Sequence, residues 1–400
     1  MSMQSETAAV LSMTVVTSAY GDGQRMTAVA IEYGDPVVRG DLEPEMFDVE
    51  GFTITSLCVS DTARGELVWT GRFVQLLLEG DPQSLRLCER GGHGEKLTVR
   101  HPVLRVTQKQ DIPTACGRTV PAFTSRPTTA VDLGIAAKFT AASFTTGDGH
   151  QLRYNLYIPE HMVPGQQYPV VLFMHDLGSC SDDITAPLLQ GTGATVWAIE
   201  SYYNRRPCFV VAPQYERKCA DDDFTVTWEA EATLELMSFL FDAYPMDRAR
   251  LYGTGQSMGC MMLCELMLRH PHTFAGLLLV AGQWDPERLA AAHDEHIWII
   301  VSSGDAKAFP IMRRAMHCME EAGAAICFSH INARADAAWL DAAIRSQKQK
   351  NANVNLTWFE GRSVVPDELD PHPGAHHVCT WVKAYDIKAL REWLFEQRLS

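Results

Sequence analysis

The stretch LYGTGQSMGCMM, from Leu251 to Met262, places a serine between two glycines directly after a short apolar run. Gly255 to Gly259 match the pattern G-x-S-x-G, in which a serine occupies a sharp strand-to-helix turn and small neighbours relieve the crowded backbone. RARLYGT before the serine is typical of a strand, and MGCMMLCELMLR after it is typical of a helix. The stretch therefore predicts that Ser257 is a nucleophile at a helix N-terminus, where backbone N–H groups favour negative charge. The alternative is a glycine turn that contains a serine without a role.

Apolar runs and helical stretches alternate on both sides of this turn. Most of the runs are continuous, as expected for strands that are buried on both faces of a sheet. We therefore expect residues 132–400 to form a mostly parallel, doubly wound α/β sheet that opens with a hairpin made of AKFTAASF and LRYNLYIP. ARADAAWLDAAIRSQKQK, residues 333–350, is an additional helical piece that we expect to form part of a lid or cap.

The N-terminal part of the chain has a different pattern. Residues 1–110 contain short β-prone runs, among them MTAVAIEY and GFTITSLCV, that are separated by turn residues. Regularly spaced strands of this kind predict a small antiparallel β-sandwich. Residues 111–131 are rich in proline, threonine and polar residues, so we expect them to be a linker.

A serine hydroxyl needs a base that removes its proton and an acid that orients this base. In this architecture the acid and then the histidine follow the serine along the chain, on loops after later strands. Asp305 ends HIWIIVSSGD and is the expected acid, with Asp285 in GQWDPE as the alternative. The histidine should precede the last helix, where HPGAHHVCTW offers His372, His376 and His377. Position alone does not separate these three.

An oxyanion hole needs a second backbone N–H group, which comes from the loop after an early strand. VVLFMHDLGS, residues 170–179, is an apolar strand that ends in such a loop. We expect the N–H groups of Leu177 and Met258 to be the two donors, and His175 to support the loop. Four side chains are candidates to line the substrate pocket. They are Gln256, Trp284, Tyr215 and Trp228. Trp284 is the strongest of them, because it follows a strand end beside the site.

Composition excludes several other classes of function. The formal net charge of −15 argues against a nucleic-acid or anionic-membrane surface, because both need basic patches. The sequence has no run of about 18 apolar residues that could span a bilayer. The eleven cysteines have no C-x-x-C pairs, so we expect reduced thiols, no metal site and no cofactor. AAVLSMTVVTSAYG near the N-terminus is more typical of a strand than of a signal peptide, which favours a cytoplasmic location.

Several stretches together resemble one esterase family, which joins an N-terminal immunoglobulin-like domain to a C-terminal α/β-hydrolase domain. It includes the EstA-type and polyhydroxybutyrate-depolymerase-like carboxylesterases. The resemblance covers most of the chain and is weaker between about Phe47 and Ile135. The matching stretches are GQRMTAVAIEYG, YPVVLFMHDLGS, FVVAPQY, RLYGTGQSMGCMM, VAGQWDPE, SSGDAKAFPIM and HVCTWVKAYDIKALREWLFEQ.

This resemblance implies a serine carboxylesterase with a Ser-His-Asp triad and an acyl-enzyme. The family's histidine begins the pattern H-x-x-x-[WF]-x-x-A-Y, which fits His377, Trp381, Ala384 and Tyr385. The family segment that carries the acid matches SSGDAKA and supports Asp305. The doubled histidine is a departure from the pattern, so His376 stays the alternative base.

The implied substrate is a small to medium carboxylic ester, with aryl or hydroxycinnamoyl (feruloyl-type) esters as one option. Two other functions remain open. The same fold and triad can cleave peptides, or the site can be vestigial in a binding or scaffolding protein. For the N-terminal domain the architecture favours a structural or homo-oligomerising role, or a role as a wall of the active-site mouth.

Overall fold

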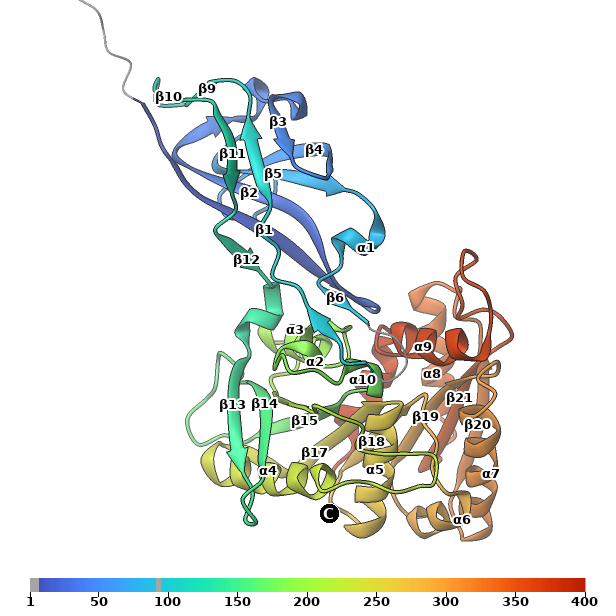
Figure 1. The fold of residues 1–400 in the computed structure, drawn as a ribbon. Helices are drawn as coiled ribbons and strands as arrows, with labels where there is room; N and C mark the ends of the chain where they lie inside the picture. The colour runs from blue at the N-terminus through green and yellow to red at the C-terminus, as the bar shows by residue number, and fades with distance from the viewer. Residues whose placement is uncertain (1–6, 91–94, 400) are drawn as a thin grey trace, which may run out of the picture. The chain divides into compact units, whose positions relative to one another are not determined.

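The computed structural model describes residues 7–90 and 95–399 of the chain (Figure 1). Contacts divide the chain into two compact units, residues 1–89 with 99–137 and residues 90–98 with 138–400.

The first unit is built from two antiparallel sheets with one added parallel strand. Its larger sheet has the strand order β12-β1-β2-β5-β4 and its smaller sheet the order β11-β8-β3. Buried side chains of both sheets, such as Ile31 and Val106, share one hydrophobic core, so the unit is a β-sandwich as predicted. The strands of the two sheets are β1 (Val10–Tyr20), β2 (Gly23–Val38), β3 (Phe47–Val49), β4 (Thr53–Ser60), β5 (Thr70–Glu79), β8 (Arg105–Gln108), β11 (Phe123–Pro127) and β12 (Ala130–Asp132). Shorter elements along residues 39–138 are η1 (Arg39–Asp41), η2 (Pro44–Met46), α1 (Pro82–Leu85), β6 (Cys88–Glu89), β7 (Thr98–Val99), β9 (Ile112–Pro113), β10 (Thr119–Val120) and η3 (Gly134–Lys138).

The predicted linker at residues 111–131 is wrong, because this segment belongs to the sandwich. Strand β11 pairs antiparallel with β8, and β12 pairs parallel with β1, the first strand of the chain. Four of the five residues of β11 are exposed, so this edge strand has a polar composition that resembles a linker. Its partners are also distant in sequence, which hides the pairing from local patterns.

The second unit contains a nine-stranded mixed sheet of order β13-β14-β16-β15-β17-β18-β19-β21-β20. Strands β13 and β14 form the predicted antiparallel hairpin at one edge, and the seven strands from β16 to β20 in this order are parallel to one another. The inner strands are buried on both faces, which explains their continuous apolar runs. The strands are β13 (Thr140–Thr145), β14 (Gln151–Tyr157), β15 (Tyr168–Met174), β16 (Phe209–Gln214), β17 (Met246–Gln256), β18 (Gly276–Val280), β19 (Ile297–Ser302), β20 (Ile326–Ile331) and β21 (Val354–Phe359).

Helices cover both faces of this sheet. Leu172 of β15 shares a core with α4, α5 and α7, whereas the adjacent Phe173 contacts Tyr385 at the end of α9. Tyr252 and Trp298 likewise contact aromatic side chains of α10. The helices are η4 (Leu177–Ser179), α2 (Ala186–Leu189), α3 (Thr195–Tyr202), α4 (Glu229–Ala243), α5 (Met258–Arg269), α6 (Pro286–Leu289), η5 (Ala290–Ala292), α7 (Ala308–Glu321), α8 (Ala337–Lys348), α9 (Pro373–Ala384) and α10 (Lys388–Glu396). In the described parts of the chain, none of the helices combines the length and the apolar character that a membrane span requires.

The helix at residues 333–350 is part of the outer layer of this unit rather than a lid. Asp336 caps the N-terminus of α8 by accepting a hydrogen bond from Trp339 N. The helix buries Leu340 and Ile344, and it contacts β20 and α10. Its amphipathic pattern therefore reflects packing on the edge of the sheet.

Candidate active site

The strand order places several loops at one edge of the sheet. Strand β16 follows β15 in the chain and lies on one side of it, whereas β17 lies on the other side. Open α/β sheets bind ligands beyond the carboxyl ends of the strands at such a switch point, because consecutive loops diverge there. The segments that follow β15, β17 and β19 contain Leu177, Ser257 and Asp305, and all three residues line one cavity.

Ser257 lies between the last residue of β17 and the first residue of α5. Its backbone has φ 50° and ψ −115°, a strained conformation for a residue other than glycine. The two glycines of the motif permit a close backbone approach: a Cβ atom on Gly259 would lie 2.0 Å from the carbonyl oxygen of Met174 in β15, and one on Gly255 would lie 2.7 Å from Gly259 C. The spacing of glycine and serine that the sequence shows is thus a packing requirement.

Ser257, His377 and Asp305 form a continuous chain of hydrogen bonds. His377 Nδ1 lies 2.6 Å from Asp305 Oδ2, and His377 Nε2 lies 2.8 Å from Ser257 Oγ. Since an ionised carboxylate only accepts hydrogen bonds, Nδ1 carries the proton and Nε2 is free to accept the serine proton. The structure therefore brings the predicted acid, base and nucleophile together in the required order.

The Asp305 carboxylate is held in place from two sides. It is 3% exposed, and Oδ1 accepts hydrogen bonds from the backbone N–H groups of Lys307 and Ala308 at the start of α7. Burial raises the pKa of Asp305, but the hydrogen bond and charge of His377 and these backbone donors outweigh it and leave the pKa below its usual value. The side chain is therefore ionised at neutral pH and can orient the imidazole.

The alternative acid and histidines have structural positions instead. His376 is buried, and its Nδ1 lies 2.9 Å from Ser302 Oγ, away from Ser257; burial lowers its pKa. His372 caps the N-terminus of α9 by accepting from Ala375 N. Asp285 caps α6 by accepting from two backbone N–H groups. Adjacent helical residues point about 100° apart, which separates His376 from His377 although their sequence context is the same.

The two predicted oxyanion donors begin helices. Leu177 is the first residue of η4, and Met258 is the first residue of α5. N–H groups at this position have no acceptor within their own helix, so they can donate to a ligand. Both residues line the cavity that contains Ser257.

His175 supports the loop that carries Leu177, as expected. Its Nε2 accepts from Tyr215 N at 2.9 Å, so Nδ1 carries the proton and donates to the carbonyl oxygen of Asp176 at 2.8 Å. The ring is completely buried, and burial lowers its pKa, so the imidazole is neutral. It links the end of β15 to the end of β16.

The cavity above Ser257 has a volume of about 670 Å³. The sequence did not predict most of the other residues that line this cavity, in particular those in the loop after β16. The only available signal was the position of this loop after the carboxyl end of an inner strand. Asp222 of the loop bonds to Gln283 and to Lys307, which come from the segments after β18 and β19. The missed lining residues are Lys218, Ala220, Asp221, Asp222, Met261, Gln283, Ala306, Lys307, Pro373 and Gly374.

The four predicted pocket side chains lie outside this lining. Gln256 is fully buried and bonds to Asp176 and Gln190. Trp284 is also fully buried, and its Nε1 donates to Glu265 in the core. Gln256 is the last residue of β17 and Trp284 lies four residues beyond β18, and the side chains of both make their contacts inside the protein.

Tyr215 and Trp228 border a different cavity, of about 370 Å³, next to β14 and the end of β16. The Tyr215 hydroxyl lies 3.0 Å from Thr233 Oγ1, and the ring of Trp228 stacks on His150. Tyr215 directly follows the last residue of β16, and neither aromatic residue lines the cavity that contains Ser257.

The described residues contain no group of three or more histidine, cysteine, aspartate or glutamate side chains that could hold a metal ion. The eleven cysteines, all within the described ranges, are not joined in disulfides. The contacts of His377 bring together a hydroxyl, an imidazole and a carboxylate at Ser257.

Comparison with known families bears on the first unit. Residues 12–121 match the model of the esterase Ig-like N-terminal domain. This match confirms the resemblance of the N-terminal region, and it extends through part of the segment that had been predicted to be a linker. No curated protein matches the sequence.

One solved structure resembles the chain over nearly its full length, and others match about two thirds of it. A thermostable esterase superposes with a TM-score of 0.81 at 24% identity, covering 98% of this chain and 100% of that one. This likeness shows a common fold. The feruloyl esterase module from Clostridium thermocellum, complexed with sinapinate, has a TM-score of 0.40 at 14% identity and covers 63% of this chain and 88% of that one. A fluorophosphonate-binding serine hydrolase from Staphylococcus aureus has a TM-score of 0.38 at 13% identity, covering 64% and 98%. The last two superpositions are too loose to bear on the fold.

Proposed function

We propose that this protein is a serine carboxylic ester hydrolase whose second unit is a doubly wound α/β-hydrolase domain. The observation that carries the proposal is the position of His377, whose two ring nitrogens contact Ser257 Oγ and Asp305 Oδ2 at once. A histidine that only stabilised the fold would not need a strained serine on one side and a buried carboxylate on the other. The match of residues 12–121 to an esterase-associated domain supports the same conclusion.

Catalysis begins with attack of Ser257 Oγ on the ester carbonyl carbon while His377 Nε2 takes the hydroxyl proton. The carbonyl oxygen becomes an oxyanion that accepts hydrogen bonds from Leu177 N–H and Met258 N–H. When the C–O bond to the alcohol breaks, the imidazolium gives its proton to the leaving oxygen. His377 then removes a proton from water, which attacks the carbonyl carbon of the acyl-enzyme. As the bond to Ser257 Oγ breaks, the imidazolium returns this proton to Oγ, and the acid is released.

The substrate that fits is a small to medium ester. A volume of about 670 Å³ lies within the range of about 300–1,000 Å³ that is usual for small-ligand pockets. The lining next to Ser257 combines the apolar side chains of Leu177, Met258 and Met261 with polar residues from the loop after β16. Aryl and hydroxycinnamoyl esters are members of this size class, and the thermostable esterase with the same fold is consistent with an ester substrate.

The direct test combines covalent labelling with turnover. We expect a fluorophosphonate probe to modify Ser257 in the folded protein and p-nitrophenyl acetate to be hydrolysed, and we expect both to be lost in Ser257→Ala. An unlabelled serine, or a Ser257→Ala variant that hydrolyses esters at the parent rate, would contradict the proposal and favour a binding protein.

A second comparison separates esters from amides. Faster turnover of an aminoacyl p-nitroanilide than of p-nitrophenyl acetate would indicate a peptidase of the same fold. A panel of esters with different acyl chain lengths, including hydroxycinnamates, then defines the acyl group. The cytoplasmic location and the absence of nucleic-acid and membrane partners stay predictions, as does the role of the N-terminal domain in assembly.

A further inference from the structure

A buried carboxylate, that of Asp176, lies in the loop after β15 that carries the predicted oxyanion donor Leu177. We call residues 175–179 the oxyanion loop. Asp176 immediately precedes Leu177, and its side chain is almost inaccessible to solvent. Its Oδ2 accepts a hydrogen bond from Gln256 Nε2 at 2.8 Å and another from Ser179 Oγ at 2.8 Å. A residue of the loop after β15 is thereby joined to the last residue of β17.

This connection lies next to both predicted oxyanion donors. Leu177 follows Asp176 in the chain, and Met258 is two residues after Gln256. We propose that Asp176 is a positioning residue that sets the distance between these two N–H groups through its bond to Gln256, with Arg90 as its counter-charge. The inference rests on the proposed ester hydrolase function and assigns a role that lies outside the triad.

Gln256 can act only through position. Its side chain is fully buried, and Nε2 also donates to Gln190 Oε1 at 3.1 Å, so it lies behind the cavity rather than in it. The charge of Asp176 orients the Gln256 amide, because a carboxylate accepts from the amide nitrogen and repels the amide oxygen. Exchanging the carboxylate for a neutral amide removes this preference.

The carboxylate needs a nearby cation, since a second negative charge next to a forming oxyanion would oppose catalysis. Arg90 Nη2 lies 4.0 Å from Asp176 Oδ2, and its Nη1 would lie 3.4 Å from a Cβ atom on Gly178. Burial raises the pKa of Asp176, but the charge of Arg90 and the hydrogen bonds from Gln256 and Ser179 outweigh it, so the pKa lies below its usual value. The group is therefore an anion whose charge is balanced by Arg90.

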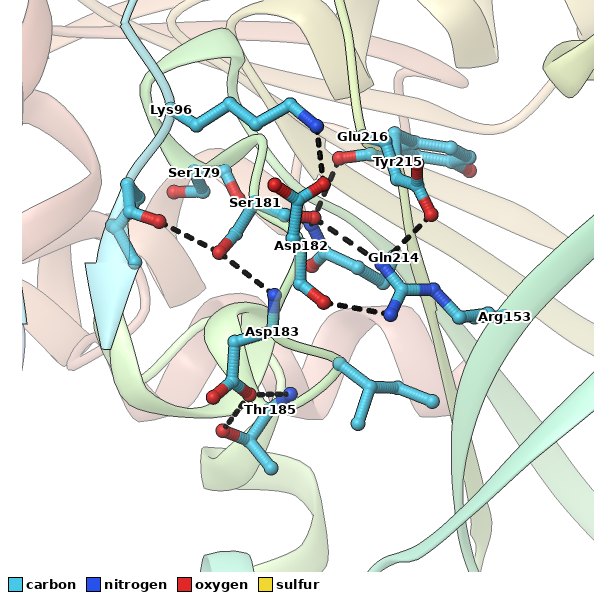
Figure 2. A network of polar contacts seen from close by, with 12 residues as sticks. Lys96, Arg153, Ser179, Ser181, Asp182, Asp183, Thr185, Gln214, Tyr215 and Glu216 are labelled. Carbon is cyan, nitrogen blue, oxygen red and sulfur yellow. Dashed lines mark hydrogen bonds and ion pairs between the residues drawn. The ribbon is translucent and has the colours of Figure 1, made fainter. Parts of the chain in front are cut away.

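Leu97, which follows Arg90 in the chain, is hydrogen-bonded to the residues just after η4. Leu97 N donates to Cys180 O at 2.8 Å, and Ser181 Oγ donates to Leu97 O at 2.6 Å. Figure 2 shows the adjacent Lys96 paired with Asp182, within a network that extends to Arg153 and Gln214. Lys96 therefore offers a matched control, because its ion pair anchors the same part of the chain without touching Asp176.

The first test uses Asp176→Asn and Gln256→Met with p-nitrophenyl acetate as the substrate. Moving a donor by about 1 Å costs about 100-fold in rate, so we expect kcat to fall by about 10-fold to 100-fold in either variant, while KM stays within about twofold because the binding walls are unchanged. A boronic acid that mimics the tetrahedral intermediate should lose affinity by the same factor as kcat/KM. A carboxylic acid product should bind as before.

The double variant tests whether the two residues act as one unit. If they do, Asp176→Asn with Gln256→Met is no slower than the slower single variant. Additive losses, or variants that unfold more easily but keep the parent kcat and boronic acid affinity, would overturn the inference and leave a purely structural role. These results are read against Ser257→Ala: an inactive Ser257→Ala with a fully active Asp176→Asn refutes only this inference, whereas an active Ser257→Ala refutes the proposed function.

Arg90 is tested against its neighbour. Arg90→Met should lower kcat by about threefold to tenfold, a smaller effect because the guanidinium is partly exposed and screened by solvent. Lys96→Met should leave kcat unchanged. Equal losses in the two variants would show that only anchoring of this part of the chain matters and would overturn the role of Arg90.

Discussion

A buried aspartate forms a close pair with a nitrogen-bearing side chain in each unit, Asp35 in the β-sandwich and Asp305 in the second unit, and the two pairs have different consequences. In the β-sandwich, Asp35 is 4% exposed and pairs with both the Nε and Nη2 groups of Arg118. In the second unit, Asp305 is 3% exposed and pairs with Nδ1 of His377. The carboxylates of Asp35 and Asp305 are thus alike in burial, and the side chains with which they pair are different.

The partner decides whether the pair can do chemistry. A guanidinium does not release its proton in proteins. The pair of Asp35 and Arg118 is therefore a permanent structural contact between β2 and the β9–β10 hairpin. An imidazole exchanges protons near neutral pH and has a second nitrogen, which in His377 points at Ser257 Oγ. The comparison indicates that a buried carboxylate suggests a catalytic site only when its partner can pass a proton onward.

The largest expected effect follows from removing that proton carrier. We expect His377→Ala to lower kcat for p-nitrophenyl acetate by about 10⁶-fold, the loss typical of a triad base. His376→Ala is the control: it removes the hydrogen bond to Ser302 and should lower the melting temperature while kcat changes less than about tenfold. The opposite pattern in steady-state kinetics would assign the base to His376.

The next effect tests the two aspartates directly. Asp305→Asn should lower kcat by about 10⁴-fold, because an amide that donates to His377 Nδ1 holds the imidazole in the wrong tautomer. Asp35→Asn should leave kcat at the parent value. Comparable losses in the two variants would mean that both pairs are structural.

A smaller loss is expected from a backbone donor that carries no formal charge. Asp176 has φ −74° and ψ 165°, which suits a residue before proline, and Leu177 is the first residue of η4, a position that accepts proline. Leu177→Pro therefore removes the N–H group at little conformational cost and should lower kcat by about 100-fold to 1000-fold. Leu177→Ala keeps the N–H group and should stay near the parent value. Single-turnover acylation measures both, and parent-like acylation in Leu177→Pro would exclude this donor.

The smallest effect concerns the structural pair and appears in stability. The hydrogen bond from Arg118 lowers the pKa of Asp35 below its usual value of about 3.9, although burial opposes the shift. Stabilisation by this carboxylate is therefore present above the pKa of the unfolded chain and is lost as the pH falls through the lower pKa of the folded protein. Asp35→Asn should lower the melting temperature by a few degrees at pH 7, and parent and variant should converge once the pH falls below the lowered pKa of the folded protein. A difference that persists in acid would contradict this origin.

Much of the proposed site could be predicted from the sequence because each part has a local requirement. The turn at Ser257 needs glycine where β15 passes within contact distance, and that need is visible as G-x-S-x-G. Asp305 ends an apolar run. The acid and the histidine are expected after Ser257 along the chain, because the loops that carry them follow later strands. His377 could be separated from His376 only through the family pattern, since the choice depends on which way α9 faces.

The remaining errors share a physical cause, which is that they depend on contacts between distant parts of the chain. Gln256 ends β17 and Trp284 lies shortly after β18, but both side chains are buried inside the protein and do not line the cavity. Strand β12 pairs with β1, more than a hundred residues earlier in the chain, so no local pattern shows that it belongs to the sandwich. The wall formed after β16 has no motif, and its place depends on the bonds of Asp222.

The approach of Gly259 to Met174 has a consequence for how such a protein can change during evolution. The backbone of Gly259 contacts the backbone of Met174 directly. No side chain lies between α5 and β15 at this point, so no substitution of a side chain can change the distance between them. Substitutions in the segment after β16 can therefore reshape what the cavity admits while the reacting groups keep their spacing. Changes in that segment can alter which substrates enter while Ser257 keeps its place against β15.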